Sequence, residues 1–273
     1  MPMRRLAKRS NGWERRPSNP LCMRWPMPPE PLETHRLPAD FNRQHQALAA
    51  LDTRGFLSWV FAPNKPFGEV GVVTSFGTES AVLLHLIADV APAAPVIFID
   101  TGFHFDETLA YRDELVRHLG LLNVRTVGLD PLSEKRSDPA RYLHLNDPDA
   151  CCQLRKVKVL DHALRHHDGW ISGQKRYQSH ERSVIDRVEW DSARGKWKFN
   201  PLADWSTADL LTYQTQQQMP AHPLASAGYL SVGCSPCTTP VSVGEDVRAG
   251  RWRHHEKREC GLHRTADVIV AAR

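Results

Sequence analysis

The fold is decided by residues 70–90, which read Val70-Gly-Val-Val-Thr-Ser-Phe-Gly-Thr-Glu-Ser-Ala-Val-Leu-Leu-His-Leu-Ile-Ala-Asp-Val90. Residues 70–74 form a short apolar run with β-branched side chains, which is typical of a buried strand. From residue 81 on, the apolar side chains recur at helical spacing. A buried strand that turns tightly into a helix is a basic unit of α/β folds.

The same alternation continues along the chain. Further strands are predicted at residues 96–99, 124–127 and 170–171, and helices at 81–90, 106–119, 151–166 and 207–217, the last capped by Ser206. Because strands and helices take turns, we expect an α/β core with a mostly parallel sheet. No internal repeat is visible.

The composition is that of an ordinary globular protein. The 273 residues contain 41% hydrophobic and 24% charged side chains, enough for one sizeable core. Six cysteines are too few and too unevenly spaced for a disulfide framework, and no signal sequence opens the chain, so we expect the reducing cytoplasm. No apolar run approaches the roughly eighteen residues of a membrane helix, so we expect no membrane partner.

The net charge of +4 is unevenly placed, with basic residues crowded at the start and before the last cysteine. The first basic cluster leads into a stretch too proline-rich for a helix, so we expect residues 1–40 to be disordered or to lie outside the domain. Residues 41–247 are predicted to form the α/β domain. Residues 248–273 are predicted to form a C-terminal tail.

The turn at residues 75–80 is the first candidate binding segment. It ends a predicted strand and begins a helix, and open α/β sheets bind ligands, anions in particular, at such places. Its members Ser75, Phe76, Gly77, Thr78, Glu79 and Ser80 supply hydroxyls and backbone N–H groups for a phosphate or sulfate. Asp100, Thr101 and Gly102 end the next strand at the same edge. The alternative is an ordinary strand–helix turn that binds nothing.

Four of the six cysteines form two pairs, Cys151-Cys152 and Cys234-Ser-Pro-Cys237. Thiolates in pairs suit zinc or an iron–sulfur cluster. Zinc modules usually separate the ligands of a pair by about two to four residues. The adjacent pair therefore favours a larger cluster, and structural zinc remains the alternative. A disulfide between neighbours is disfavoured by geometry and by the compartment.

Cys260 is left for chemistry. It follows a basic segment that contains Arg248 and Arg251, and nearby cations favour the nucleophilic thiolate. The alternative is an incidental surface thiol. Lys175, Arg176 and Arg182 form a further basic loop, which is either a second anion clamp or ordinary solvated charge.

Taken together, the motifs resemble the assimilatory adenylyl-sulfate reductases, within the broader phosphoadenylyl-sulfate reductase family. The resemblance spans about residues 70–263. It rests on the turn at 75–80, Ile99-Asp-Thr-Gly102 with Glu107-Thr108, Cys151-Cys152 with Lys156, Trp170-Ile-Ser-Gly173, Gly228-Tyr229, Gly233-Cys-Ser-Pro-Cys-Thr238, Arg248-Ala-Gly-Arg-Trp252 and Glu259-Cys-Gly-Leu-His263. The chain departs from the family in having Lys175 where an Arg is usual, and Arg253-His254-His255 after Trp252.

The resemblance implies a doubly wound fold of the adenine nucleotide alpha hydrolase or ATP pyrophosphatase type, with an iron–sulfur site and a mobile C-terminal tail. It implies that the turns at 75–80 and 100–102 bind adenosine 5'-phosphosulfate. It assigns further substrate contacts to Lys156, Lys175, Arg176, Arg248, Arg251 and His263, and a [4Fe-4S] cluster to Cys151, Cys152, Cys234 and Cys237.

By the same resemblance Cys260 is the catalytic nucleophile. It attacks the sulfur, releases AMP and forms an S-sulfocysteine, from which thioredoxin or glutaredoxin liberates sulfite for cysteine biosynthesis. A homo-oligomer is left open, and no nucleic-acid partner is expected.

Three alternative functions are considered. An ATP pyrophosphatase that adenylates its substrate is disfavoured because Phe76 replaces a glycine of its usual loop. A zinc-stapled nucleic-acid-binding module would need a broad basic face, whereas the charge here is local. The third alternative is an enzyme that reduces the 3'-phosphorylated sulfonucleotide, either alone or in addition to adenosine 5'-phosphosulfate. The turn carries Glu79 and no Lys or Arg lies between residues 70 and 103, so we expect the non-phosphorylated form to be preferred.

Overall fold

The computed structural model describes residues 39–64, 66–253, 255–263 and 268–269. Within them the chain forms a sheet of the strands β1 (Val70–Thr74), β2 (Val96–Asp100), β3 (Val124–Gly128), β4 (Gly169–Ile171), β5 (Val188–Asp191), β6 (Lys196–Phe199) and β7 (Val268–Ile269). Residues 1–38 of the predicted extension, with Cys22, lie outside the described residues, as do 264–267 and 270–273 of the predicted tail. The domain boundaries at 41 and 247 stay predictions.

The strand order is β3-β2-β1-β4-β6-β5-β7. The five strands from β3 to β6 are parallel, and β5 pairs antiparallel with both of its neighbours. The mostly parallel sheet predicted from the alternation is confirmed. The chain first adds strands on one side of β1 and then returns to the other side at β4, so the order reverses between β1 and β4. Such a switch point is where open α/β sheets form a crevice at the carboxyl ends of their strands.

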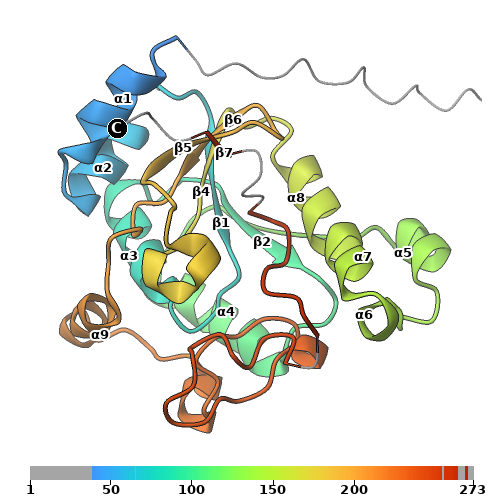
Figure 1. Cartoon of the computed structure of the whole chain (residues 1–273). Coiled ribbons are helices and arrows are strands. Elements are labelled where there is room, and N and C mark those ends of the chain that lie inside the picture. Colours follow the sequence, from blue (N-terminus) through green and yellow to red (C-terminus); the bar gives the residue numbers. More distant parts are fainter. Residues whose placement is uncertain (1–38, 65, 254, 264–267, 270–273) are drawn as a thin grey trace, which may run out of the picture. The chain divides into compact units, whose positions relative to one another are not determined.

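Helices cover both faces of the sheet (Figure 1). They are α1 (Phe41–Ala49), α2 (Thr53–Val60), α3 (Ser80–Val90), α4 (Asp106–Leu119), α5 (Pro131–Ser137), α6 (Leu143–Asn146), α7 (Pro148–Cys152), α8 (Lys158–Ala163) and α9 (Thr207–Gln216). Alternate side chains of β2 show the two faces: Val96 and Phe98 join the core formed with α2, α3 and α4, whereas Ile97 and Ile99 pack with Leu160 of α8. The fold is therefore doubly wound.

The helix predicted at residues 151–166 is divided. α7 begins at Pro148 and ends at Cys152, a π-helical turn follows at Gln153–Val157, and α8 begins at Lys158. The predicted start at Cys151 was wrong, because the side chain of Asp147 already caps the helix by accepting from Ala150 N. π-turns are rare and are frequent at functional sites. This one buries two successive cations, Arg155 and Lys156.

Two parts of the fold were not predicted. α1 and α2 precede β1, and β5 and β6 form an antiparallel hairpin that widens the sheet. No helix among the described residues has both the length and the apolar composition to cross a membrane.

Candidate active site

A cavity opens at the switch point between β1 and β4. Its walls come from the segments that follow β1, β2 and β4, from the π-helical turn at Gln153–Val157 and from two later segments. They include Ser75, Gly77, Thr78, Glu79, Ser80, Thr101, Lys156, Lys175, Arg248, Arg251, Cys260 and His263. Most of the predicted site residues thus meet at one place, although they lie up to 188 positions apart in the sequence (263 minus 75). Phe76, Asp100, Gly102 and Arg176 do not line this cavity.

The turn after β1 is held in shape by Phe76. This residue has a left-handed φ of 48°, which is unusual for a bulky side chain, and its ring is fully buried against Phe98. Its backbone N–H donates to Thr74 Oγ1 at 3.2 Å. We expected Phe76 to contact the substrate. Its side chain instead packs in the core, and this packing fixes the position of the turn.

Asp100 and Gly102 have structural contacts instead of a place in the cavity wall. Asp100 Oδ1 accepts from Gly102 N at 2.8 Å, and Gly102 O accepts from Arg141 Nη2 at 2.5 Å. Of the predicted group at the end of β2, Thr101 lines the cavity. The carboxylate of Asp100 therefore orders the loop.

Glu79 accepts three hydrogen bonds, from Lys175 Nζ at 2.9 Å, from Gln178 Nε2 at 2.6 Å and from Tyr177 Oη. Burial raises the pKa of the Glu79 carboxyl, but Lys175 and the two other donors outweigh it, so the pKa lies below its usual value. Arg176 points elsewhere and pairs with Asp204 and Asp186. The basic loop is thus engaged by acidic side chains.

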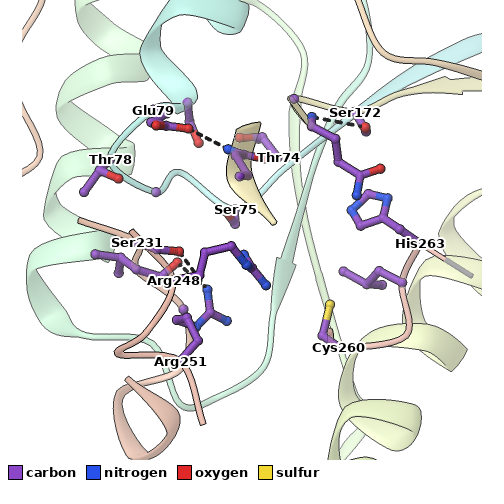
Figure 2. A pocket seen from close by; sticks show the side chains of 18 of the residues that line it. Thr74, Ser75, Thr78, Glu79, Ser172, Ser231, Arg248, Arg251, Cys260 and His263 are labelled. Carbon is purple, nitrogen blue, oxygen red and sulfur yellow. Dashed lines mark hydrogen bonds between the residues drawn. The ribbon is translucent and has the colours of Figure 1, made fainter. Parts of the chain in front are cut away.

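Three cations border the cavity on other sides. Arg248 and Arg251 lie together and opposite Cys260 and His263 (Figure 2). Burial, reinforced by Arg182, lowers the pKa of Arg248 to about 10, so it remains charged at neutral pH. Lys156 is 9% exposed, and its charge favours the thiolate of Cys234, whose pKa lies below its usual value although burial opposes this. Arg251 Nε is buried without a partner among the described residues, so it can still receive an anion.

Cys260 and His263 come from the C-terminal segment. The Cys260 sulfur points into the cavity (Figure 2) and is electrostatically coupled to Lys156 and Arg248. His263 stacks on Trp170 with 5.3 Å between ring centroids. Burial, followed by nearby Lys198, lowers the pKa of His263 well below its usual value, so its ring is neutral. Its Nδ1 has no partner among the described residues.

The four paired cysteines gather beside the cavity. Cys151, Cys152 and Cys234 are buried and Cys237 is half-buried, and the charge of Cys234 acts on each of the other three. Burial raises the pKa of Cys151 to about 11 and of Cys152 to about 12.

Burial also acts on Cys234 in this direction, but Lys156 and the hydroxyl of Thr101 outweigh it and lower its pKa. Three buried thiols and one half-buried thiol, with the charge of Lys156 acting on them, fit a thiolate-ligated cluster. In the part of the chain that the structure describes, no three His, Cys, Asp or Glu side chains are close enough to hold a single metal ion.

Sequence reasoning missed several wall residues. Ser172 and Gln174 follow β4 on the same edge as the β1 turn, and Gln174 Oε1 is buried without a partner among the described residues. The rule that ligands bind at the carboxyl ends of parallel strands would have found both, had β4 been placed next to β1. Ser231 and Glu259 also line the cavity. Glu259 was quoted within a motif and given no role.

The fold and the cavity define an open α/β protein with a cavity at the switch point of the sheet, the place where proteins of this class bind their ligands. A family model described as the phosphoadenosine phosphosulfate reductase domain matches residues 69–240. The chain belongs to this family, which confirms the resemblance seen in the sequence.

Two curated relatives are named for two different sulfonucleotides. The "Adenosine 5'-phosphosulfate reductase" of Mesorhizobium japonicum is 46% identical over 71% of this chain and 76% of its own length. The "Phosphoadenosine 5'-phosphosulfate reductase" of Gloeobacter violaceus is 44% identical over 72% of this chain and 83% of its own.

Among solved structures, a phosphoadenylyl-sulfate reductase from Candida auris in a phosphate complex matches with a TM-score of 0.62. It is 22% identical and covers 76% of this chain and 100% of that one. At this identity the likeness supports the fold alone.

Proposed function

We propose that this protein reduces adenosine 5'-phosphosulfate to sulfite and AMP, through an S-sulfocysteine on Cys260, in sulfate assimilation in the cytoplasm. The observation that carries the proposal is the arrangement of the cavity. A thiol and three cations face one another at the sheet edge where this fold class binds ligands. Relatives named adenosine 5'-phosphosulfate reductase support the same reaction.

The first half-reaction needs a thiolate and fixed positive charge. The Cys260 thiolate attacks the sulfur of the phosphosulfate, an S–S bond forms, and the bond from sulfur to the bridging oxygen breaks. That oxygen leaves with the phosphate of AMP and carries the developing negative charge. Arg248, Arg251 and Lys156 border the cavity and are suited to stabilise it, because preorganised donors do not have to reorient during the reaction.

The second half-reaction consumes two electrons from a dithiol. One thiolate of thioredoxin or glutaredoxin attacks Cys260 Sγ, sulfite leaves, and a mixed disulfide forms. The second redoxin thiol then releases Cys260 as a thiol.

Cys151, Cys152, Cys234 and Cys237 are proposed to hold a [4Fe-4S] cluster. When bound, it supplies a fixed charge next to Lys156 and stays in one redox state. The effect of the Lys156 charge on the Cys234 thiol supports this arrangement, because Lys156 also lines the cavity and so lies near both the ligand set and the cavity. The proposed role of Lys156 is to place its positive charge near the phosphosulfate.

Adenosine 5'-phosphosulfate is proposed as the preferred sulfonucleotide. A 3'-phosphate would need a cation, and the three cations of the basic loop are already paired: Lys175 with Glu79, Arg176 with Asp204 and Asp186, and Arg182 with Glu259. Taking Lys175 or Arg182 would leave Glu79 or Glu259 unpaired in a largely buried place, which is costly. Because both preferences occur in the names of relatives, this point needs its own measurement.

The proposal is tested by incubating the iron-loaded protein with each sulfonucleotide, with and without thioredoxin, under anaerobic conditions. We expect sulfite and AMP in equal amounts when reductant is present. Without reductant we expect AMP equal to the amount of enzyme and a mass increase on Cys260. Absence of AMP release from either nucleotide would reject the reaction.

A further inference from the structure

Glu259 directly precedes Cys260, and its carboxylate lies in the cavity wall. Arg182 Nε donates to Glu259 Oε1 at 2.6 Å and Arg182 Nη2 donates to Oε2 at 2.9 Å. Arg248 Nη2 adds a longer bond of 3.3 Å to Oε2. The side chains of Glu259 and Arg182 are 18% and 11% exposed. A two-point, charge-assisted pair of this kind fixes orientation as well as distance.

The partner of Glu259 is itself anchored to the sheet. Arg182 Nη1 donates to Gln178 Oε1 at 2.5 Å, and Gln178 Nε2 donates to Glu79 Oε2 at 2.6 Å. Glu79 lies in the turn after β1. A chain of hydrogen bonds therefore runs from the strand edge through Gln178 and Arg182 to the residue next to the thiol.

The other contacts of the C-terminal segment are single bonds or lie farther from the sulfur. Arg194 Nη1 donates to Leu262 O at 3.2 Å, and Arg248 Nη2 donates to Arg258 O at 3.1 Å. Lys257 pairs with Asp149, whose side chain is 80% exposed. The Lys257 side chain is 6% exposed, but its partner is open to solvent, which screens the pair. The Glu259–Arg182 pair is the strongest contact that the structure shows within one residue of Cys260.

We propose that Glu259 is a positioning residue: its pair with Arg182 holds the Cys260 thiol in the cavity, facing Arg248 and Arg251. The catalytic consequence rests on the function proposed above, whereas the placement of the thiol does not. Loss of the pair releases the segment, so the thiol spends less time in line with the phosphosulfate and more time in solvent.

The test compares Glu259→Gln with a matched control, Glu245→Gln. Glu245 also accepts two bonds from one arginine, with Arg253 Nη1 and Nη2 both at 2.8 Å, but it does not line the cavity. Three quantities are measured in the intact iron-loaded protein. They are the iodoacetamide alkylation rate of Cys260 without nucleotide, the rate of S-sulfo adduct formation at saturating adenosine 5'-phosphosulfate, and the Kd for AMP.

For Glu259→Gln we expect alkylation about tenfold faster and adduct formation about tenfold slower, with the AMP Kd within about threefold of wild type. Glu245→Gln should leave all three unchanged. Arg182→Gln should resemble Glu259→Gln, and the double variant should be no worse than either, because both substitutions break one pair.

An alkylation rate within twofold of wild type overturns the positioning role, whether or not turnover occurs. A fall in AMP affinity that matches the fall in adduct rate also overturns it, because Glu259 would then belong to nucleotide binding. If the wild-type protein forms no adduct, the proposed reaction fails, and the alkylation rates still decide the placement of the thiol.

Discussion

Lys175 Nζ donates to Glu79 Oε2 at 2.9 Å and joins the loop after β4 to the turn after β1. The two segments follow the strands on either side of the switch point. The pair therefore links two walls of the cavity. The lysine side chain is 2% exposed and the glutamate 24%. A buried cation whose carboxylate is removed loses its compensation without regaining water.

Glu79→Gln should therefore destabilise the fold by about 3 kcal/mol, because it leaves Lys175 buried and uncompensated. The measurement is urea unfolding of the iron-loaded protein. The double substitution Glu79→Gln with Lys175→Met should recover most of the loss, and Glu245→Gln, at an exposed position, should unfold at the same urea concentration as wild type. A stability for Glu79→Gln equal to that of the Glu245 control would mean that the pair contributes nothing.

Substitution of a paired cysteine should remove the cluster. We expect Cys152→Ser and Cys237→Ser to lose iron, acid-labile sulfide and activity together, because a hydroxyl is a poor substitute for a thiolate ligand. Cys22→Ser is the control, since Cys22 has no partner at a recognisable spacing in the sequence. Full iron and sulfide content in either paired variant would reject the ligand assignment.

Cys260→Ser should keep the iron and bind AMP, yet form no S-sulfo adduct, because a serine hydroxyl is far less ionised than a thiol at neutral pH. Mass spectrometry after incubation with substrate and no reductant checks this. An adduct on another cysteine of the wild-type protein, in place of Cys260, would show that Cys260 is not the nucleophile.

The preference between sulfonucleotides is expected to be at least about tenfold in kcat/KM, in favour of the form without a 3'-phosphate. One unpaired buried charge is enough for that factor, since about 1.4 kcal/mol corresponds to tenfold. The assay uses saturating thioredoxin with each nucleotide in turn. Equal values would show that a cation of the basic loop can leave its carboxylate.

Stability should fall in acid through His222. Its Nδ1 accepts from Leu224 N at 3.2 Å, so the folded state needs the neutral ring. Burial lowers its pKa to about 4, with Glu107 opposing the shift. The folded pKa lies below the unfolded value of about 6.5, so this stability is present above pH 6.5 and is lost as the pH falls toward 4.

The expected slope from this group is up to about 1.4 kcal/mol per pH unit. His222→Asn retains an acceptor and removes the titration, so its unfolding free energy should change less between pH 6.5 and 4.5. Identical slopes in urea unfolding of the two proteins would exclude His222 as the cause.

Features that depend on local sequence patterns were predicted well. The strand at 70–74 and the helix at 106–119 have the predicted bounds, and the turn, the cysteine pairs and the basic segments were all visible. The sequence could not predict which basic side chain pairs with which acidic side chain. Lys175 was predicted to contact the substrate, and Arg182 was placed in a loop that was either an anion clamp or solvated charge. Each pairs with a carboxylate that is 77 or more positions away. Such pairing depends on strand order, which no local pattern encodes.

Phe76 shows the other limit. Its place in a Ser- and Gly-containing turn suggested contact with ligand, but a left-handed backbone turns the ring into the core. Backbone dihedrals of this kind cannot be inferred from a bulky residue type, because they are disfavoured for it and are imposed by the surroundings.

The π-helical turn at Gln153–Val157 amounts to one residue inserted into an otherwise regular helix. It sets the rotational phase between the cysteine pair before it and the apolar face of α8 after it. Removing one residue there would rotate the two halves by about 100° relative to each other. With Leu160 kept against the sheet, Cys151 and Cys152 would turn away from Cys234. A single-residue length change, without loss of any ligand, would thus be enough to separate the two cysteine pairs.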